Sequence, residues 1–187
     1  MTDPSHSAST DAQGSGPSAQ HRREAAGRRA RCAVLTISDT RTFADDRSGP
    51  LMASMLEAAG HAVAARAIVP DASDALRDTV AGWIADGVED GPIDLIVTSG
   101  GTGIAARDGT VERVAPLLDR VLDGFGELFR MLSYDQVGSA AMLSRAIGGL
   151  ADGTFVFVLP GSPKAVSLAL EKLIVPELPH LLRERDR

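Results

Sequence analysis

The sequence is poor in cysteine and lacks any long hydrophobic run. A single cysteine, Cys32, stands among the 187 residues, which excludes a disulfide framework and a metal site of the usual Cys/His spacing. Cys32 opens an apolar run, so we expect it to be an inert core thiol. No run approaches the roughly 18–20 apolar residues of a membrane span, and the N-terminus has no hydrophobic signal core. We therefore expect a cytoplasmic protein without a membrane partner.

The chain also lacks an excess of positive charge. Its 19 Lys and Arg residues are outnumbered by 25 Asp and Glu residues, giving a net charge of −6. This balance argues against nucleic acid as a partner. Residues 1–29 are rich in Ser, Ala, Gln and Gly and show no apolar period, so we expect a disordered tail there. Residues 30–187 are expected to form a single domain, and a core of that size needs neither disulfide nor metal.

Apolar runs and helical spacing alternate in the first half of the domain. Strand-like runs at 32–38, 62–69 and 93–98 are separated by helical patterns at about 51–59 and 73–86. This order predicts an α/β fold with a mostly parallel sheet and helices on its faces.

The second half of the domain continues with helices and a hairpin. Short helices are expected at about 111–118 and, after two punctuating glycines, at 127–133. Two apolar runs within 145–159, separated by a turn, predict a hairpin and hence one antiparallel edge strand. The last helix should begin after the N-cap Ser162 and end at about residue 174, because Pro176 is expected to stop it.

A glycine-rich segment directly follows the third predicted strand. Gly100, Gly101 and Gly103 have no side chains, so a ligand can approach the backbone closely there. Successive N–H groups at a bend form an anion-binding concavity. The chain has no Gly-Lys-Ser/Thr sequence, which excludes a Walker loop. Gly101, Gly103 and Ala106 match the spacing of the dinucleotide-binding fingerprint. The match is weak evidence for dinucleotide binding, because it does not follow the first strand. A turn that serves only backbone geometry remains an alternative.

Three carboxylates follow the three parallel strands. Ligands of such sheets bind beyond the carboxyl ends of the strands, and the loops there carry Asp39, Asp71 and Asp108. Each one alone is more simply a turn or cap residue. Together with the glycine segment they favour metal-assisted phosphoryl or nucleotidyl chemistry, since Mg²⁺ takes one or two carboxylates plus phosphate oxygens. Asp45 and Asp46, by contrast, are expected to lie in a solvated loop.

A second candidate anion site lies at the start of the last helix. Ser162 and Pro163 suit the N-cap and first helical positions. Lys164 in the first turn opposes the helix dipole, and a bound anion would compensate for it. A capped helix start with no ligand explains Ser162 and Pro163 equally well.

Several motifs between about Arg31 and Leu182 occur together. They are Thr36-Ile-Ser38-Asp39, Asp46-x-Ser48-Gly49, Val69-Pro-Asp71, Thr98-Ser-Gly-Gly-Thr-Gly103 with Arg107-Asp108, Gly124-Phe-Gly-Glu127, Ser144-Arg145 and Leu159-Pro-Gly-Ser-Pro-Lys164. In this combination the chain resembles the MoaB/MogA family of molybdenum cofactor biosynthesis proteins. The segment 124–134 is closer to MoaB than to MogA.

The resemblance implies a three-layer α/β/α sandwich that binds molybdopterin. Active family members adenylylate molybdopterin with Mg-ATP and release pyrophosphate, and their two key carboxylates, which would hold Mg²⁺, fall on Asp71 and Asp108. The chain keeps Arg107-Asp108 and Pro70-Asp71, so we expect an active adenylyltransferase. The residues expected to bind molybdopterin or nucleotide are Ser38, Asp39, Ser99, Gly100, Gly101, Thr102, Gly103, Arg107, Gly161, Ser162, Pro163 and Lys164.

The resemblance also implies assembly into a homotrimer or a homohexamer. Two other classes of function stay open at this point. One is a protein that binds molybdopterin without catalysis, and the other is a nucleotide-dependent oxidoreductase suggested by the fingerprint-like glycines.

Overall fold

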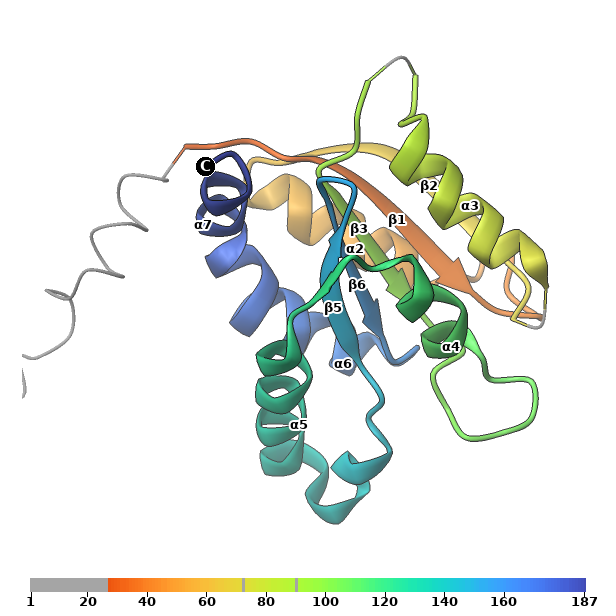
Figure 1. Ribbon diagram of the computed structural model, residues 1–187. Coiled ribbons are helices and arrows are strands. Elements are labelled where there is room, and N and C mark those ends of the chain that lie inside the picture. The colour runs from red at the N-terminus through yellow and green to blue at the C-terminus, as the bar shows by residue number, and fades with distance from the viewer. Residues whose placement is uncertain (1–26, 72, 90) are drawn as a thin grey trace, which may run out of the picture.

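A six-stranded mixed sheet forms the centre of the molecule (Figure 1). The computed structural model describes residues 27–71, 73–89 and 91–187, so residues 1–26 of the expected tail lie outside it. The strands are β1 (Arg31–Ile37), β2 (Ala62–Val69), β3 (Leu95–Ser99), β4 (Arg120–Val121), β5 (Ile147–Ala151) and β6 (Thr154–Leu159). Their order is β2-β1-β3-β6-β5-β4. The first four strands of that order are parallel, and β5 and β4 are antiparallel to their neighbours.

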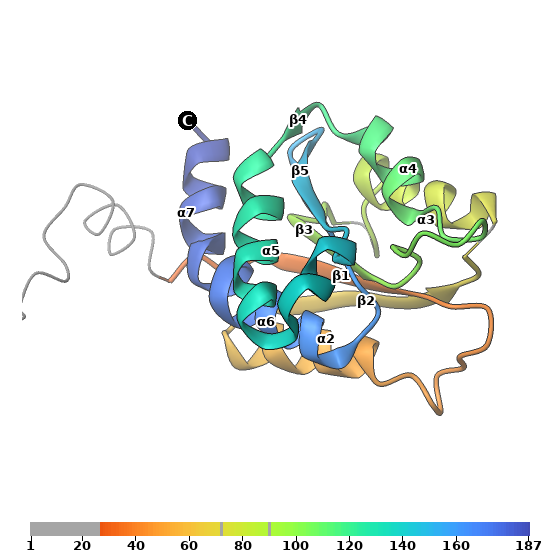
Figure 2. The same cartoon turned by 90° about the horizontal axis from the view of Figure 1, so that it is seen from below.

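Helices cover both faces of the sheet (Figures 1 and 2). They are α2 (Ser48–Ala58), α3 (Asp74–Ala85), α4 (Thr110–Val114), α5 (Asp123–Val137), α6 (Pro163–Ala169) and α7 (Val175–Arg185), with the shorter turns η1 (Ala115–Leu117), η2 (Gly138–Leu143) and η3 (Leu170–Ile174). One core cluster joins the sheet to α2, α5, α6 and α7, and a second joins its other face to α3 and α4. The predicted three-layer α/β/α sandwich is therefore confirmed.

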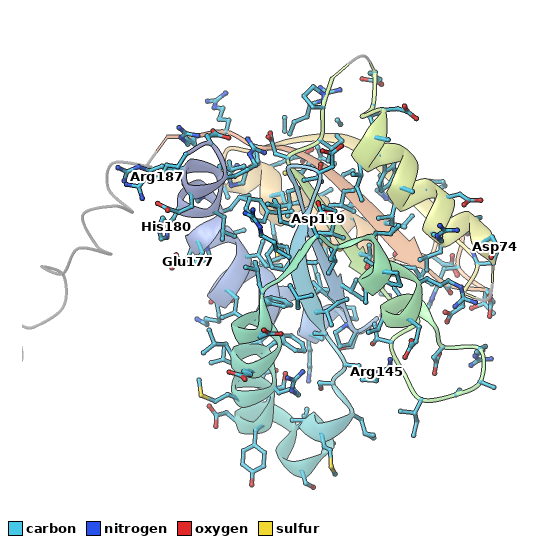
Figure 3. All side chains as sticks on the ribbon, in the orientation of Figure 1. Asp74, Asp119, Arg145, Glu177, His180 and Arg187 are labelled. Carbon is cyan, nitrogen blue, oxygen red and sulfur yellow. The ribbon has the colours of Figure 1, made fainter. Side chains whose placement is uncertain are left out.

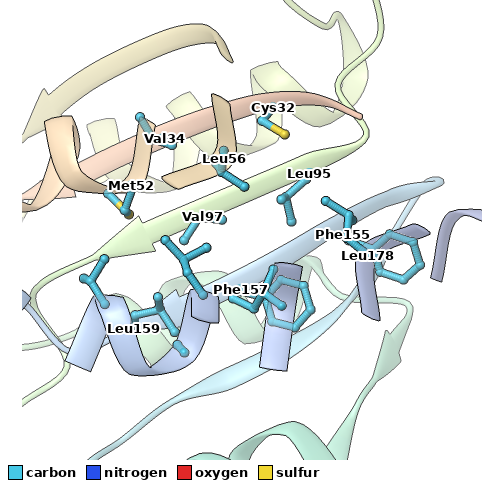
Figure 4. Close-up of a cluster of buried hydrophobic side chains, with 14 of the residues drawn as sticks. Cys32, Val34, Met52, Leu56, Leu95, Val97, Phe155, Phe157, Leu159 and Leu178 are labelled. Carbon is cyan, nitrogen blue, oxygen red and sulfur yellow. The ribbon is translucent and has the colours of Figure 1, made fainter. Parts of the chain in front are cut away.

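Strand β1 is buried on both faces, as a central parallel strand should be. Cys32 and Val34 contribute to the core cluster on the α2 side, where Met52 and Leu56 pack (Figure 4). Leu35 belongs to the cluster on the α3 side. Burial, followed by the charge of Asp94, raises the pKa of Cys32 to about 12, so the expectation of an inert core thiol fits its surroundings.

The predicted hairpin is present, and a further strand extends the sheet beyond it. Asp152 and Gly153 both have positive φ, +42° and +79°, which is the two-residue turn that suits tightly connected strands. The two-residue strand β4 pairs with β5 on the outer side. Strand β4 was not predicted, because two residues show no measurable alternation of apolar and polar side chains.

Helix α5 is longer than the sequence indicated. It begins at Asp123, so Gly124 and Gly126 lie inside it rather than before it. Each interior glycine disfavours a helix by about 1 kcal/mol, but Phe125 and Phe129 are buried one turn apart with ring centroids 6.2 Å from each other. Phe125 also meets the edge of Phe157 at 4.7 Å. Aromatic burial therefore outweighs the local preference.

The expectation that Pro176 ends the last helix is wrong. After α6 the chain passes through the π-helical turn η3 and continues as α7 to Arg185, with Pro176 in the first turn of α7 and Pro179 inside it. The chain is already helical before Pro176, and the π-helical turn η3 directly precedes α7; π-helical turns mark places where the regular i→i−4 ladder is interrupted. Burial of Leu178 and Leu182 against the core then stabilises the continuation. In the part of the chain that the structure describes, no helix is long and apolar enough to cross a membrane.

His61 links stability to pH at the start of β2. The ring is buried, its Nδ1 accepts a hydrogen bond from the Ala30 N–H at 3.2 Å, and burial lowers its pKa. A lowered histidine pKa means that the contribution to stability is complete above the unfolded pKa of about 6.5 and is lost as the pH falls through the folded value.

We expect the melting temperature to fall as the pH drops from about 7.5 to about 5, and to fall less in His61→Asn. Asparagine keeps an acceptor near the position of Nδ1 but does not titrate. Thermal unfolding of both proteins across this range checks the prediction. Identical pH profiles for the two proteins would show that His61 is not the linked group.

Candidate functional site

The loops that follow β1, β2, β3 and β6 meet at one edge of the sheet. The Ser38 N–H donates to the Val69 carbonyl at 2.9 Å, and the Gly100 N–H donates to the Leu159 carbonyl at 3.0 Å. Between the first two loops, the Asp71 N–H donates to Asp39 Oδ1 at 3.0 Å. Backbone pairing thus connects these segments, which are far apart in the sequence, at the carboxyl ends of the parallel strands.

A pocket of about 540 Å³ opens at this edge. Its volume lies within the roughly 300–1,000 Å³ of small-molecule sites. Of the residues expected to bind ligand, those that line it are Ser38, Ser99, Gly100, Gly101, Thr102, Gly103, Gly161 and Pro163. Thr36, Asp46 and Ser48 also line the pocket, from β1 and the start of α2. The loops after β1, β3 and β6 therefore share one cavity.

Ser162 and Lys164 line a different cavity. It has a volume of about 720 Å³, lies between α5 and α6, and shares Pro160 and Pro163 with the first pocket. Ser162 caps α6 as predicted, because its Oγ accepts the Ala165 N–H at 3.1 Å. Lys164 is exposed and does not line the glycine-rich pocket. Lys164 therefore lies outside the pocket that residues 100–103 line.

The three carboxylates approach one another at the ends of β1, β2 and β3. Asp71 is 6% exposed, whereas Asp108 is half-buried and Asp39 is exposed. Burial raises the pKa of Asp71, and the charges of Asp108 and Asp39 raise it further, against the Gly109 N–H and Arg113, which lower it. Asp71 Oδ1 is buried without a hydrogen-bond partner among the described residues. Such an oxygen is available to a cation or a donor.

The glycines are required by close approaches between the segment and its neighbours. Gly101 has φ +62°, and a Cβ on it would lie 2.3 Å from Asp71 Oδ1 and 2.2 Å from Thr110 Oγ1. A Cβ on Gly100 would lie 2.1 Å from the Ile37 carbonyl oxygen, and one on Gly103 would lie 2.4 Å from Asp108 Oδ2. The same bare backbone therefore lines the pocket and contacts the carboxylates.

Two side chains brace the loop that carries Asp108. Asp108 Oδ2 accepts the Ala105 N–H at 2.8 Å, which closes the loop on itself. Arg145 donates to the Gly103 carbonyl at 3.0 Å and pairs with Glu112, and Figure 3 shows it beside this loop. Arg107 is exposed in the same loop. Arg145 belongs to one of the sequence motifs, but no role was predicted for it.

Asp46 is a site residue that sequence reasoning missed. The expectation of a solvated loop fits the exposed Asp45, but it is wrong for Asp46, which is buried. Asp46 Oδ1 accepts the N–H groups of Ser48 and Gly49 at 3.0 and 3.1 Å, and Oδ2 accepts from Thr36 Oγ1 at 3.0 Å. The carboxylate therefore caps α2. An Asp two residues before a helix start is the signal that could have found it.

The capped start of α2 holds the loop after β6. Ser48 Oγ donates to the Gly161 carbonyl at 3.0 Å, and Ser99 Oγ donates to the Pro160 carbonyl at 3.3 Å. A Cβ on Gly161 would lie 3.3 Å from the Gly100 Cα. The loop after β6 is thus packed directly on the glycine segment, and both line the pocket.

The donor set around Asp71 fits a hard cation that is shared with a substrate. Within residues 27–71, 73–89 and 91–187 no group of three or more His, Cys, Asp or Glu side chains could hold a metal ion. A cation here would take one or two carboxylates from the protein and complete its shell from water and ligand oxygens, which is how Mg²⁺ binds alongside substrate phosphates. The unpartnered Asp71 Oδ1 is consistent with that use.

We expect Gly101→Ala to destabilise the protein more than Gly60→Ala. Both glycines have positive φ, +62° and +87°, so both substitutions carry a backbone cost of about 1–2 kcal/mol. No heavy atom of the described chain lies within 4 Å of a Cβ on Gly60, whereas one on Gly101 collides with Asp71 and Thr110. Chemical denaturation of the two variants measures the difference. Equal losses would contradict the close approach at Gly101.

The comparisons with known proteins identify the family. The family described as "Probable molybdopterin binding domain" matches residues 33–180. Molybdenum cofactor biosynthesis protein B of Bacillus subtilis (strain 168) is 53% identical over 155 residues, which cover 82% of this chain and 89% of that protein.

Solved structures agree with this assignment. A crystal structure of molybdenum cofactor biosynthesis protein B is 48% identical, with a TM-score of 0.80, over 86% of this chain and 98% of the other. The tungsten cofactor synthesizing protein MoaB from Pyrococcus furiosus is 37% identical, with a TM-score of 0.73, over 87% of this chain and 100% of the other. The chain therefore belongs to the MoaB/MogA family of molybdenum cofactor biosynthesis proteins, on its MoaB side.

Proposed function

We propose that this protein is a molybdopterin adenylyltransferase, which transfers AMP from Mg-ATP to molybdopterin and releases pyrophosphate. The observation that carries the proposal is the buried Asp71 carboxylate, whose Oδ1 finds no partner in the described chain, directly behind the glycine segment that lines the pocket. A site of this kind suits a phosphate-bearing ligand and a cation together.

The reaction is a nucleotidyl transfer that needs no protein nucleophile. A phosphate oxygen of molybdopterin attacks the α-phosphorus of ATP and forms a new P–O bond. The bond from the α-phosphorus to the oxygen that bridges to the β-phosphate breaks, and its electron pair leaves with pyrophosphate. The attacking oxygen is already ionised, so the protein contributes mainly positioning and charge stabilisation.

The residues around the glycine segment divide this work. On the pocket side, the bare backbone of residues 100–103 and the loop at Gly161 are placed to bind phosphate and pterin groups. Next to this segment, Asp71 and Asp108 would hold Mg²⁺, which when bound would neutralise charge on the triphosphate. Arg145 donates to the Gly103 carbonyl and so holds the loop that leads from the glycine segment to Asp108.

The raised pKa of Asp71 follows from its position in this scheme. Without a cation, burial and two neighbouring carboxylates disfavour its ionised form. Cation binding requires that form, so cation affinity should increase as the pH rises through the pKa of Asp71 in the folded protein.

We expect Asp71→Asn and Asp108→Asn each to lower kcat/KM for adenylyl-molybdopterin formation by at least about 100-fold, because metal-held charge stabilisation is worth several kcal/mol. Asp78→Asn, an exposed carboxylate on α3, is the matched control and should keep wild-type activity. The measurement is product formation from molybdopterin, ATP and Mg²⁺. Wild-type rates in both site variants would show that Asp71 and Asp108 do not have the proposed role in binding Mg²⁺ for catalysis.

The same assay separates this proposal from binding without catalysis. If the wild-type protein binds molybdopterin but forms no adenylyl product with Mg-ATP, the adenylyltransferase proposal fails. A molybdopterin-binding function would then account for the pocket.

We further propose that the protein assembles as a homotrimer or homohexamer through the surface of α5 and η2. Six large apolar side chains there are 47–78% exposed: Leu128, Met131, Tyr134, Val137, Met142 and Leu143. Concentrated exposed apolar surface of this kind marks protein–protein contact sites. Leu143 also lines the glycine-rich pocket, so this surface reaches the rim of the site.

The assembly should have a mass three or six times the chain mass of 19.5 kDa. Met131→Lys places a charge in the middle of the exposed apolar surface and should shift the protein towards the monomer. Val121→Lys, at a half-exposed apolar residue on β4, should not. Light scattering after size-exclusion chromatography measures all three proteins. A monomeric wild type would overturn the proposal.

A further inference from the structure

Thr110 presents a buried hydroxyl group that the fold does not use. It is the first residue of α4 and is 0% exposed, yet its Oγ1 has no hydrogen-bond partner within the described chain. A buried hydroxyl without a partner lowers stability, because it has lost water and gained nothing in exchange. Most buried polar groups are satisfied, so an exception of this kind calls for a specific cause.

A second unused oxygen lies beside it. Asp71 Oδ1 is also buried and lacks a partner among the residues described. The two oxygens flank the same point, where a Cβ on Gly101 would stand 2.2 Å from Thr110 Oγ1 and 2.3 Å from Asp71 Oδ1. They come from the loop after β2 and from the start of α4, and they converge on the space beside one glycine.

The backbone fixes this convergence. The Thr110 N–H donates to the Gly101 carbonyl at 3.0 Å, so the start of α4 is tied to the glycine segment. Asp71 is tied in turn to the loop after β1 through its N–H bond to Asp39. The two oxygens are therefore preorganised rather than brought together by mobile side chains.

We propose that the Thr110 hydroxyl is a third protein oxygen of the divalent-cation site formed with Asp71 and Asp108. This inference rests on the cation of the proposed function and adds a ligand to it. Hard cations take oxygen ligands, and hydroxyl oxygens of Ser and Thr serve Mg²⁺ in nucleotide sites of other proteins. A neutral oxygen also adds coordination without adding charge, in a region that already holds three carboxylates.

The alternative is a structural hydroxyl that donates to Asp71 when no cation is bound. The two cases differ in what removal of the hydroxyl does to the cation-free protein. Removing a structural hydrogen bond to a charged group destabilises the fold, whereas removing an unpartnered hydroxyl does not.

Thr110→Val removes the hydroxyl at nearly constant volume, and Thr110→Ser keeps it. Thr98→Val is the matched control, because Thr98 Oγ1 is equally buried and equally without a partner in the described chain, but lies on β3. The probes are Mn²⁺ alone and Mn²⁺ with pyrophosphate. Calorimetry measures their affinity, and melting in chelator measures the stability of the cation-free protein.

In chelator, Thr110→Val and Thr98→Val should melt at or above the wild-type temperature. Thr110→Val should bind Mn²⁺ at least about tenfold more weakly, in line with the effect of losing a supporting ligand interaction, and should lose most of the cation-induced rise in Tm. Thr110→Ser and Thr98→Val should bind Mn²⁺ like the wild type.

Three results would overturn the inference. They are wild-type Mn²⁺ affinity in Thr110→Val, a marked loss of stability of that variant in chelator, and no Mn²⁺ binding by the wild type with or without pyrophosphate. Failure of AMP transfer is a separate result. Thr110-dependent Mn²⁺ binding without adenylyl product would support the inference and reject the proposed reaction.

Discussion

The bare backbone at Gly100–Gly103 is the constraint on which the rest of the site depends. This segment lines the pocket and also lies against Asp71, Thr110 and Asp108 at distances that leave no room for a Cβ. A side chain at Gly101 would collide with Asp71 and Thr110 and push them away from the segment. Because the strand ends are fixed by the parallel sheet, the loops can approach this closely without paying the full entropy of ordering free segments.

The supporting contacts divide into those that hold the glycine segment and those that hold its facing loop. Arg145 holds the Gly103 carbonyl, and Ser48 holds the Gly161 carbonyl. Ser48 is itself positioned by the buried Asp46 carboxylate at the start of α2. The walls of the pocket are therefore supported by polar contacts from the protein interior, which is how precise sites are usually stabilised.

Periodicity and turn chemistry were enough to predict the sheet, the hairpin and the Ser162 cap, because these depend on neighbours in the sequence. The predictions failed where contacts between residues far apart in the sequence determine the structure. Packing of Phe125 and Phe129 on the core carries α5 through two glycines, and burial of Leu178 carries α7 past Pro176. The burial of Asp46 depends on how the loop after β1 folds over the sheet edge. The convergence of three carboxylates was predictable, because parallel strands end on one side.

Leu143 belongs to two surfaces at once. It lines the glycine-rich pocket and is also part of the exposed apolar surface of α5 and η2. If a second copy covers that surface, the wall of the pocket is completed only in the assembled protein. Occupancy of the site and association of the chains would then be linked equilibria, each favouring the other by the same free energy. Dilution alone would weaken ligand binding, and saturating ligand would hold the assembly together.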